Sequence, residues 1–377
     1  MYSNDNRTVV TLDAGGTNFV FGAVRGNREI VEPVRLASQA DDLDKCMAAL
    51  VEGFSQVLAQ LEKAGDKPVA ISFAFPGPAD YPNGIIGGYL PNFPSFRDGV
   101  ALGPFLEGRF GLPVFINNDG DLYAYGEALA GALPEVNEKL RAAGSAKQFN
   151  NLLGYTLGTG FGVGMVVDGK LNRGDNSCVE TWCLPHRTKR EVIVEDGVAI
   201  RAIQRVYGER IGDPAHGLEP REIYEIALEK RPGCNMAARV AFEEMGKVLG
   251  DAIATAATLV DGLVVIGGGL AAAHEFFMPA LLGEMRSQMR TLSGDVIDRM
   301  QMRVYDLDDE AEFAAFARGD SRELKVYGSD STVTYDPQKR MGIMISKLGA
   351  SRAISLGAYA FALSALDTHA CVSQLVG

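Results

Sequence analysis

The sequence predicts an α/β protein built from two lobes. Its 377 residues exceed what one hydrophobic core usually serves. Apolar runs typical of buried strands alternate with segments of helical period, and a strand, glycine turn, strand pattern occurs at residues 8–24 and again at 151–171. The 47% hydrophobic content supports compact folding of both lobes.

The first half of the chain opens with an expected β-hairpin. Residues 8–13 are β-rich and end at an acid, two glycines follow, and residues 19–24 resume a strand pattern. Residues 43–61 have helical spacing and lead into a buried strand that ends at the Pro76-Gly77 turn. A short strand over 112–116 then presents Asn117, Asn118 and Asp119 before a helical segment.

The second half repeats this order of elements. Residues 151–171 predict strand, glycine turn and strand, and residues 260–271 predict a strand followed by a glycine turn. Residues 286–348 carry several charges and a hairpin expected to turn at Gly328-Ser329, to which we assign no chemistry. Residues 351–367 predict a closing helix with small and apolar residues on one face.

Composition argues against several classes of protein. A formal net charge of -12 argues against nucleic acid as a partner. The polar start MYSNDNR lacks the features of a secretory signal, and the apolar stretches are too interrupted for a membrane span, so we expect a cytoplasmic protein. Five cysteines, an odd number without a paired framework, fit reduced thiols.

Two glycine-rich turns are candidates for phosphate binding. Asp13 ends the first strand, and Gly15, Gly16, Thr17 and Asn18 follow it, so backbone amides there can approach phosphate oxygens closely. Taken alone, this stretch is more often just a turn. The arrangement recurs from residue 158 to 164, where such crowding of glycine weakens a strand unless close backbone approach is required.

The second turn is neither of two common nucleotide motifs. It does not continue into Gly-Lys-Ser/Thr and a helix, as a P-loop does. Strand-forming residues 165–167 follow it, whereas a dinucleotide motif opens a helix. A third turn, Gly267-Gly268-Gly269, follows a buried strand and could lie against an extended ligand, with a tight βα turn as the alternative.

Three acids are candidates for chemistry at a sugar. Asp119 at a strand end could accept a proton from a hydroxyl that attacks phosphorus, or could merely cap the next helix. Glu180 and Glu195 flank a segment without clear helix or strand period, which suits carboxylates that accept hydrogen bonds from sugar hydroxyls. Solvated surface glutamates are the alternative.

The order of these motifs resembles the ROK family of bacterial sugar kinases and repressors, across nearly the whole chain. The matching stretches are LDAGGTNFVFGAV, FAFPGPAD, PNFPSF, NNDGDLYAYGE, LGTGFGVGMVVDGKLNRG and VVIGGGLA. The resemblance implies a two-lobed actin-like ATPase (ribonuclease H-like) fold, with a nucleotide and sugar cleft between the lobes. It also implies ATP and Mg²⁺ as cofactors and a homodimer.

The resemblance also assigns roles to residues. It makes Asp119 the general base and places Asp13 near magnesium, through water. The substrate-binding positions are Gly77, Asn92, Asn118, Asp119, Glu180 and Glu195, and the nucleotide-binding positions are Gly15, Gly16, Thr17, Asn18, Gly158, Thr159, Gly160, Gly267, Gly268 and Gly269.

The expected lobes follow from the same resemblance. Residues 1–130 would form the N-terminal lobe, completed by the C-terminal helix 356–377, and residues 131–355 would form the C-terminal lobe. Within the latter, 286–348 would be a segment that varies in the family.

The chain departs from the family pattern at three positions. Trp182 and Cys183 replace the usual glycine and sugar-contacting histidine, and Asp121 replaces an asparagine. The family's zinc site joins that histidine to nearby cysteines, but residues 184–194 contain no cysteine, so we expect no structural zinc. These departures leave the sugar and the hydroxyl that receives the phosphate open.

We expect an enzyme that phosphorylates a hexose hydroxyl with ATP, as glucokinases and hexokinases of the family do. Family repressors carry an N-terminal helix-turn-helix module, whereas only a few residues precede the first strand here, which favours an enzyme. The alternatives are a sugar-sensing regulator without catalytic activity and a kinase for an N-acetylated amino sugar.

Overall fold

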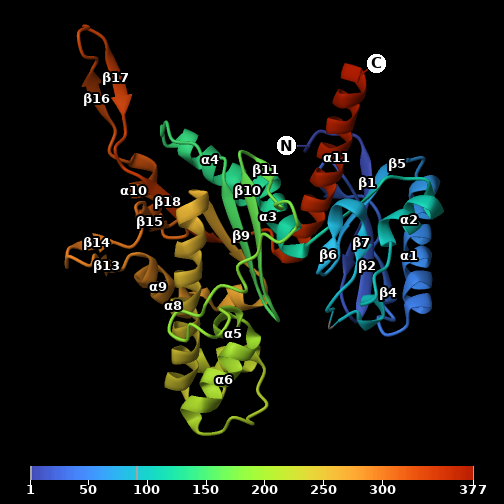
Figure 1. Ribbon diagram of the computed structural model, residues 1–377, viewed down its shortest axis with the longest axis horizontal. Helices are drawn as coiled ribbons and strands as arrows, with labels where there is room; N and C mark the ends of the chain where they lie inside the picture. Colours follow the sequence, from blue (N-terminus) through green and yellow to red (C-terminus); the bar gives the residue numbers. More distant parts are fainter. Residues whose placement is uncertain (1, 91, 377) are drawn as a thin grey trace. The chain divides into compact units, whose positions relative to one another are not determined.

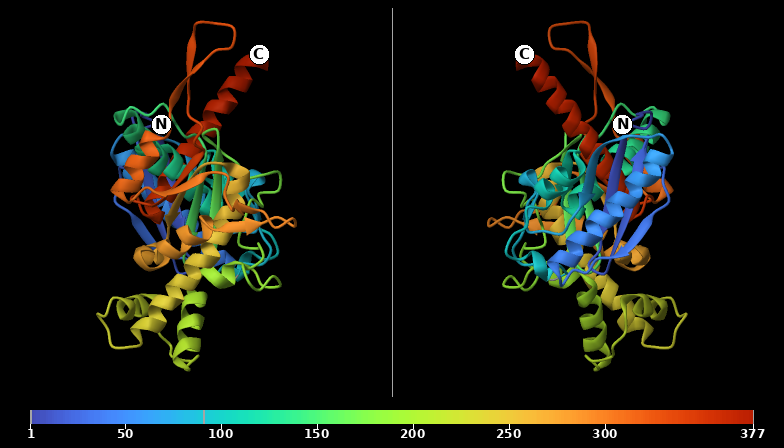
Figure 2. Two further views of the ribbon diagram at one scale, coloured as in Figure 1. Left: turned by 90° about the vertical axis from the view of Figure 1, so that its left-hand side faces the viewer. Right: turned by 90° about the vertical axis from the view of Figure 1, so that its right-hand side faces the viewer.

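The computed structural model describes residues 2–90 and 92–376 (Figures 1 and 2). The chain divides into two compact units. The first unit comprises Met1–Gly131, Gly164–Val179 and Leu348–Gly377, and the second comprises Ala132–Val163 and Glu180–Lys347. The first boundary lies one residue from the expected one. The C-terminal part of the first unit begins at Leu348, earlier than the expected residue 356. The helix α11 (Ala350–Val376) is continuous across the expected boundary.

The sheet of the first unit has the strand order β3-β2-β1-β5-β8. β1 (Thr8–Ala14) pairs antiparallel with β2 (Asn18–Arg25), which confirms the expected hairpin, and runs parallel to β5 (Pro68–Ala74). β5 in turn runs parallel to β8 (Val114–Asn117). Asp13, Ala74 and Asn117 are consecutive partners across these strands, so their carboxyl ends meet at one edge.

β8 begins two residues later than the sequence predicted and extends one residue further. Pro113 precedes it, and proline has no backbone N–H to donate to a sheet, although its carbonyl accepts a hydrogen bond from Ile71 N. Asn117 therefore belongs to the strand and pairs with Ala74. This register puts Asn118 and Asp119 directly at the junction with the next helix.

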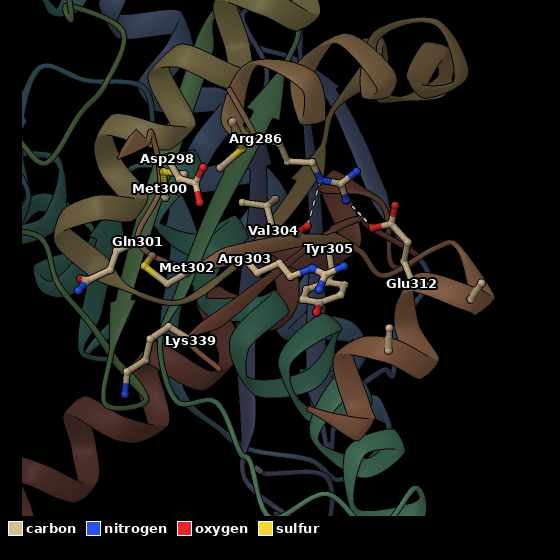
Figure 3. A pocket seen from close by; sticks show the side chains of 13 residues that line it. Arg286, Asp298, Met300, Gln301, Met302, Arg303, Val304, Tyr305, Glu312 and Lys339 are labelled. Atoms are coloured by element: carbon tan, nitrogen blue, oxygen red, sulfur yellow. Dashed lines mark hydrogen bonds and ion pairs between the residues drawn. The ribbon is translucent and has the colours of Figure 1, made fainter. Parts of the chain in front are cut away.

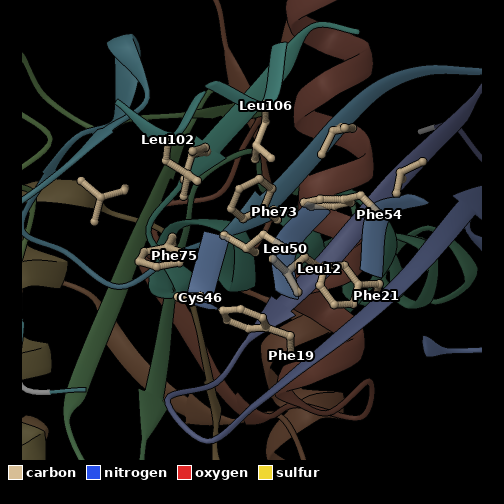
Figure 4. Packing of buried hydrophobic residues seen from close by; sticks show 14 of the residues in the cluster. Leu12, Phe19, Phe21, Cys46, Leu50, Phe54, Phe73, Phe75, Leu102 and Leu106 are labelled. Atoms are coloured by element: carbon tan, nitrogen blue, oxygen red, sulfur yellow. The ribbon is translucent and has the colours of Figure 1, made fainter. Parts of the chain in front are cut away.

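An aromatic cluster fills one side of this sheet (Figure 4). α1 (Leu43–Lys63) buries its apolar stripe there, as its spacing predicted. Its N-cap is Asp42, whose side chain accepts a hydrogen bond from Lys45 N. Gly53 lets the helix approach closely, because an added Cβ would collide with the Phe21 ring. Fully buried rings of the cluster are Phe19, Phe21, Phe54, Phe73, Phe75, Phe93 and Phe96.

Two helices of the first unit pack through glycine. An added Cβ at Gly126 of α3 (Asp119–Ala130) would collide with the Ala353 backbone of α11, and one at Gly357 would collide with the Leu122 backbone. Gly164 likewise lies against the Gly120 carbonyl at the start of α3. Backbone contacts this close on two sides fix α3 firmly.

The second unit contains four parallel strands in the order β9-β12-β18-β15. These are β9 (Leu152–Leu157), β12 (Leu263–Gly267), β18 (Arg340–Ile345) and β15 (Arg303–Asp306). The expected strands over 151–171 and 260–271 are confirmed, with β10 (Phe161–Val167) following β9 after a short turn.

The segment 286–348 contributes to this sheet as well as extending beyond it. β15 and β18 are strands of the main sheet, which charge and composition did not indicate. Two hairpins, β13 (Gln288–Arg290) with β14 (Val296–Asp298) and β16 (Arg322–Lys325) with β17 (Thr332–Tyr335), extend away from it (Figure 1). The second is the hairpin expected around Gly328.

The remaining elements connect these strands. No helix in the described part of the chain is long and apolar enough to cross a membrane. The elements not yet given are β3 (Arg28–Glu29), β4 (Val34–Ala37), β6 (Ala79–Asp80), η1 (Tyr81–Asn83), β7 (Ile85–Ile86), η2 (Pro94–Phe96), α2 (Leu102–Phe110), α4 (Ala132–Ala142), β11 (Lys170–Leu171), α5 (Glu195–Val198), α6 (Ile200–Ile211), α7 (Pro220–Ala227), α8 (Asn235–Val260), η3 (Gly269–Ala273), α9 (His274–Met285) and α10 (Glu310–Arg318).

Candidate active site

The turn from β8 into α3 carries the acid expected to be catalytic. Asn118 is the N-cap of α3, and its side chain accepts a hydrogen bond from Gly120 N at 2.7 Å. Asp119 is the first residue of the helix, and its Oδ1 also accepts from Gly120 N, at 3.0 Å. Capping therefore falls to Asn118, while Asp119 is an exposed residue at a helix N-terminus.

The pKa of Asp119 is raised above that of an ordinary aspartate. Desolvation by the surrounding protein is the main cause, and the nearby Asp13 carboxylate adds to the rise, while backbone amides partly oppose it. The side chain nevertheless has the accessible surface of an exposed residue. Because solvent reaches Asp119, its carboxylate keeps part of its hydration, which limits the rise in its pKa.

Asp121 and Arg173 lie close to this turn. Asp121 is buried, with 5% of its surface exposed, and desolvation raises its pKa to about 7 even though the Arg173 charge lowers it. Arg173 Nη1 donates to Asn117 Oδ1 at 2.9 Å, and the guanidinium carbon lies 5.0 Å from the centre of the Phe361 ring. Burial thus holds the pKa of Asp121 well above that of an ordinary aspartate, and the Arg173 charge offsets only part of this rise.

The first glycine turn is fixed by hydrogen bonds from its own unit. Gly15 N donates to Asn18 O at 3.0 Å, and Ser38 N donates to Thr17 O at 3.0 Å. Gly16 lies against Asn92, because a Cβ added there would be 3.0 Å from Asn92 Cβ. The structure thus brings the candidate sugar residue Asn92 to the candidate phosphate turn.

Gly77 also lies in the first unit, just beyond β5. A Cβ added there would be 2.9 Å from the Tyr81 hydroxyl, which donates to Phe75 O at 2.8 Å. Packing therefore accounts for this glycine. Nothing at Gly77 by itself indicates contact with a sugar.

The second glycine turn joins β9 to β10 in the second unit. Gly158 N donates to Gly160 O at 3.1 Å, and Thr159 is exposed at the tip. Glu195 Oε2 accepts from Phe161 N at 2.9 Å, and Glu195 Oε1 accepts from Arg201 Nη2 at 2.8 Å. The structure therefore brings Glu195 to this turn, and any sugar hydroxyl would have to share oxygens that already accept hydrogen bonds.

The third glycine turn follows β12, whose last residue Gly267 pairs with Thr156 of β9. Gly268 has φ +88°, and an added Cβ would collide with the Leu157 backbone, so this position requires glycine for the fold itself. Gly269 differs, since its backbone is not left-handed and a Cβ added there would meet no atom within 4 Å. Gly158 is open in the same way.

Glu180 to Glu195 forms an irregular loop in the second unit. Glu180 is half-buried, Trp182 is 42% exposed and Cys183 is an exposed free thiol. Backbone hydrogen bonds close the loop, from His186 N to Val192 O at 2.7 Å and from Val194 N to Leu184 O at 2.7 Å.

The side chain of His186 stabilises this loop through hydrogen bonds to its backbone. It is buried, and its Nδ1 accepts from the backbone amides of Thr188 and Lys189, each at 3.3 Å. An accepting Nδ1 is unprotonated, so we place the proton of the neutral ring on Nε2. Desolvation is the main cause that lowers the pKa of His186, with Lys189 and Arg205 adding to the effect.

We expect His186 to make the stability of the protein fall in acid. A depressed pKa in the folded state means that the neutral ring stabilises the fold above the unfolded value of about 6.5, and this stability is lost as pH falls through the folded pKa. His186→Gln should lower the melting temperature by about 4 °C at pH 8. The difference from wild type should shrink towards pH 5.

Thermal unfolding from pH 5 to 8 measures this effect. His274→Gln, which changes an exposed histidine, is the matched control and should leave the curve unchanged. A melting-temperature difference for His186→Gln that is constant with pH would show that the ring is not titrating.

No group of three or more His, Cys, Asp or Glu side chains in the described part of the chain is arranged to hold a metal ion. Of the residues near the lost zinc motif, Cys178 Sγ donates to Asn176 O, and the ring of His186 bonds to backbone amides. The absence of zinc stays a prediction. Elemental analysis of protein purified without added metal should find far less than one zinc per chain, and stoichiometric zinc lost together with stability on chelation would contradict it.

The donor set fits Mg²⁺ and ATP. Asp13 offers an exposed carboxylate, the hard oxygen ligand that Mg²⁺ prefers, and a divalent cation there would relieve its repulsion of Asp119. Gly158 and Gly269 leave open space at strand ends that a Cβ would fill, which suits close approach of a nucleotide.

A cavity of about 600 Å³ elsewhere in the second unit contains none of these residues (Figure 3). It lies along the outer strand β15, where Arg286 Nε donates to Val304 O and Glu312 Oε2 accepts from Asp306 N. These side chains satisfy backbone groups of an edge strand, which protects the edge from pairing. The cavity is therefore not a candidate active site, because its polar side chains already bind the backbone of β15 and none of the candidate site residues lines it.

Sequence reasoning missed several residues that support the candidate site. Arg173 and Asn117 stand within matched motifs but received no role, and Arg201 and Ser38 lie outside them. Arg201 links Glu195 to the Thr159 carbonyl. An arginine or serine that binds backbone of a distant loop leaves no local pattern, so only the tertiary structure reveals it.

The family model "ROK family" matches residues 9–303, and the chain belongs to the ROK family. This match and the structural comparisons confirm the expected α/β fold of the actin-like ATPase type. A glucokinase from Parabacteroides distasonis is 59% identical, with a TM-score of 0.88 over 97% of this chain and 99% of that one.

More distant relatives differ in what they are named for. A ROK hexokinase from Thermus thermophilus is 21% identical, with a TM-score of 0.65 over 96% of this chain and 99% of that one, and shows the fold alone. An N-acetyl-D-glucosamine kinase from Vibrio cholerae is 31% identical over 44% of this chain and 48% of its own length. The chain thus spans about half the length of such curated relatives.

Proposed function

We propose that the protein transfers the γ-phosphoryl group of ATP to a hydroxyl of a hexose, with glucose as the first candidate. The observation that carries the proposal is the pair of open glycines, Gly158 and Gly269. The fold requires no glycine at either position, and each stands at the carboxyl end of a parallel strand. A ligand whose phosphates or base must touch backbone supplies the missing reason.

Asp119 would act as the general base. Its carboxylate takes the proton from the attacking hydroxyl as the oxygen–phosphorus bond forms and the bond from γ-phosphorus to the β-phosphate oxygen breaks, releasing ADP. A raised pKa makes the carboxylate a stronger base than ordinary aspartate, and the helix N-terminus tolerates the charge before the transfer. Asp13 would hold Mg²⁺ through water, and the cation would neutralise charge on the phosphates.

The sugar contacts are proposed for Gly77, Asn92, Asn118, Glu180 and Glu195. Carboxylates and amides accept and donate hydrogen bonds to sugar hydroxyls. The nucleotide would lie against Gly15, Gly16, Thr17, Asn18, Gly158, Thr159, Gly160, Gly267, Gly268 and Gly269. A cytoplasmic location, where ATP is abundant, is part of the proposal.

A second candidate is a kinase for an N-acetylated amino sugar. The 31% identity to an N-acetyl-D-glucosamine kinase favours it, and Trp182 and Cys183 would change the surroundings of a bound sugar. A coupled assay of ADP release across glucose, fructose, mannose, allose, glucosamine and N-acetylglucosamine tests both. We expect the highest kcat/KM with glucose, and no sugar-dependent release with any of them would contradict both candidates.

A homodimer is proposed as well, and the hairpin β16–β17 suits its interface. Leu324 faces Val333 and Arg322 faces Tyr335 across the two strands, so one face is largely apolar, yet every residue of both strands is exposed. An isolated hairpin is marginally stable alone. The strand Thr332–Tyr335 carries no charge or proline to protect its edge.

A second copy of this chain is the partner that the charges favour. Two copies with a net charge of -12 each repel one another over most of their surface, whereas residues 322–335 contain two basic and two acidic side chains. Light scattering should give the mass of two chains for wild type and of one for Leu324→Asp/Val333→Asp. A monomeric wild type, or a variant that stays dimeric, would contradict this interface.

A further inference from the structure

Arg173 joins three elements of the first unit at one point. It follows the β11 strand, its Nη1 donates to Asn117 Oδ1 at the end of β8, and its guanidinium lies 5.0 Å from the Phe361 ring of α11. The cation over an aromatic face and the charged hydrogen bond both hold the side chain in one place.

Asn117 is placed to transmit this restraint. It is completely buried, and its backbone carbonyl accepts a hydrogen bond from Phe75 N at 3.0 Å. Its Nδ2 has no hydrogen-bond partner within the described residues, so the bond from Arg173 is what orients its side chain. The next two residues along the chain are Asn118, which caps α3, and Asp119.

Two further contacts bind the same segment to α3. Asp121 and Arg173 interact through their charges, and each charge opposes the pKa shift that burial causes in the other residue. Gly164 of β10 lies so close to the Gly120 carbonyl that a Cβ would not fit. The segment Gly164–Val179 therefore meets the first turn of α3 in two ways. Gly164 packs against its backbone, and the Arg173 charge acts on its Asp121.

We propose that Arg173 is a positioning residue, which acts through Asn117 to fix the first turn of α3 and hence the carboxylate of Asp119. The proposal rests on the proposed phosphoryl transfer and goes beyond it, because Arg173 contacts neither the base nor any candidate substrate residue within hydrogen-bonding distance. Its effect should fall on the chemical step, since misplacing a reacting group by about 1 Å can cost about 100-fold in rate.

The test measures kcat and the two KM values for Arg173→Met, Asn117→Ala and the double variant. We expect Arg173→Met to lower kcat by about 30-fold while each KM changes by less than about 3-fold. Because Arg173 acts through Asn117, the double variant should be about as slow as Arg173→Met alone instead of showing the product of two losses. Arg173→Lys, which keeps the charge, should recover part of kcat.

The matched control is Arg25→Met, which removes an arginine paired with Asp66 elsewhere in the same unit and should leave kcat unchanged. Wild-type kcat in Arg173→Met, or fully multiplicative losses in the double variant, would overturn the proposal. If Arg173→Met fails to fold, Arg173→Lys and Asn117→Ala decide by the same split between kcat and KM. A wild type without sugar-dependent ADP release would instead contradict the proposed function itself.

Discussion

Asp119→Asn is expected to lower kcat for sugar-dependent ADP release by about 1000-fold or more. General-base catalysis contributes about 100-fold to 10,000-fold, and an amide cannot take the proton. The asparagine oxygen can still accept the hydrogen bond from Gly120 N, so the turn should keep its shape and sugar binding should largely persist. Steady-state kinetics and calorimetric titration with sugar measure the two effects separately.

Asp44→Asn, which alters an exposed acid on α1, is the matched control and should have wild-type kinetics. The raised pKa of Asp119 adds a pH dependence, because the base works only when ionised. Activity of the wild type should decline on acidification at a pH above about 3.9, the ordinary aspartate value. Near wild-type turnover in Asp119→Asn would remove this residue from the catalytic role.

Gly268→Ala is expected to destabilise the protein by about 3 kcal/mol or more. A positive φ costs a side-chain-bearing residue about 1–3 kcal/mol, and here the added methyl would also collide with the Leu157 backbone. Leu157 directly precedes Gly158, so the second glycine turn should be displaced and the KM for ATP should rise. Urea unfolding and ATP kinetics measure the two consequences.

Gly269→Ala is the matched control within the same turn. Its added methyl meets no protein atom within 4 Å, so stability should stay within about 0.5 kcal/mol of wild type. The KM for ATP should nevertheless rise several-fold, because the open space would belong to the nucleotide. A stable Gly268→Ala would contradict the packing, and an unchanged KM in Gly269→Ala would contradict the nucleotide placement.

Local sequence patterns predicted those elements for which the hydrophobic spacing and the turn residues indicate the same structure. The hairpin around Gly15 and Gly16, the helix from Leu43 and the strand before Gly267 followed from period and turn residues alone. Strands β15 and β18 were missed because their short apolar runs sit within a charged segment, and their pairing depends on residues far away in the sequence.

From the sequence alone, only those residues of the candidate site that stand within recognisable motifs could be proposed. Asp119 and the glycine turns stand out locally, whereas the reasons for individual glycines do not. Only the structure separates Gly268, which packing requires, from Gly269, which it does not. Arg173 gave no signal because its role depends on where Asn117 and Phe361 lie in space.

Phosphorus NMR of ATP, magnesium, glucose and the purified protein tests the central claim most directly. We expect the γ-phosphate resonance of ATP to decline as a sugar phosphomonoester resonance of equal intensity grows, with Asp119→Asn showing neither change on the same time scale. Loss of the γ-phosphate as inorganic phosphate, or no loss in the presence of any hexose or N-acetylated hexosamine, would contradict the assignment of this protein as a sugar kinase.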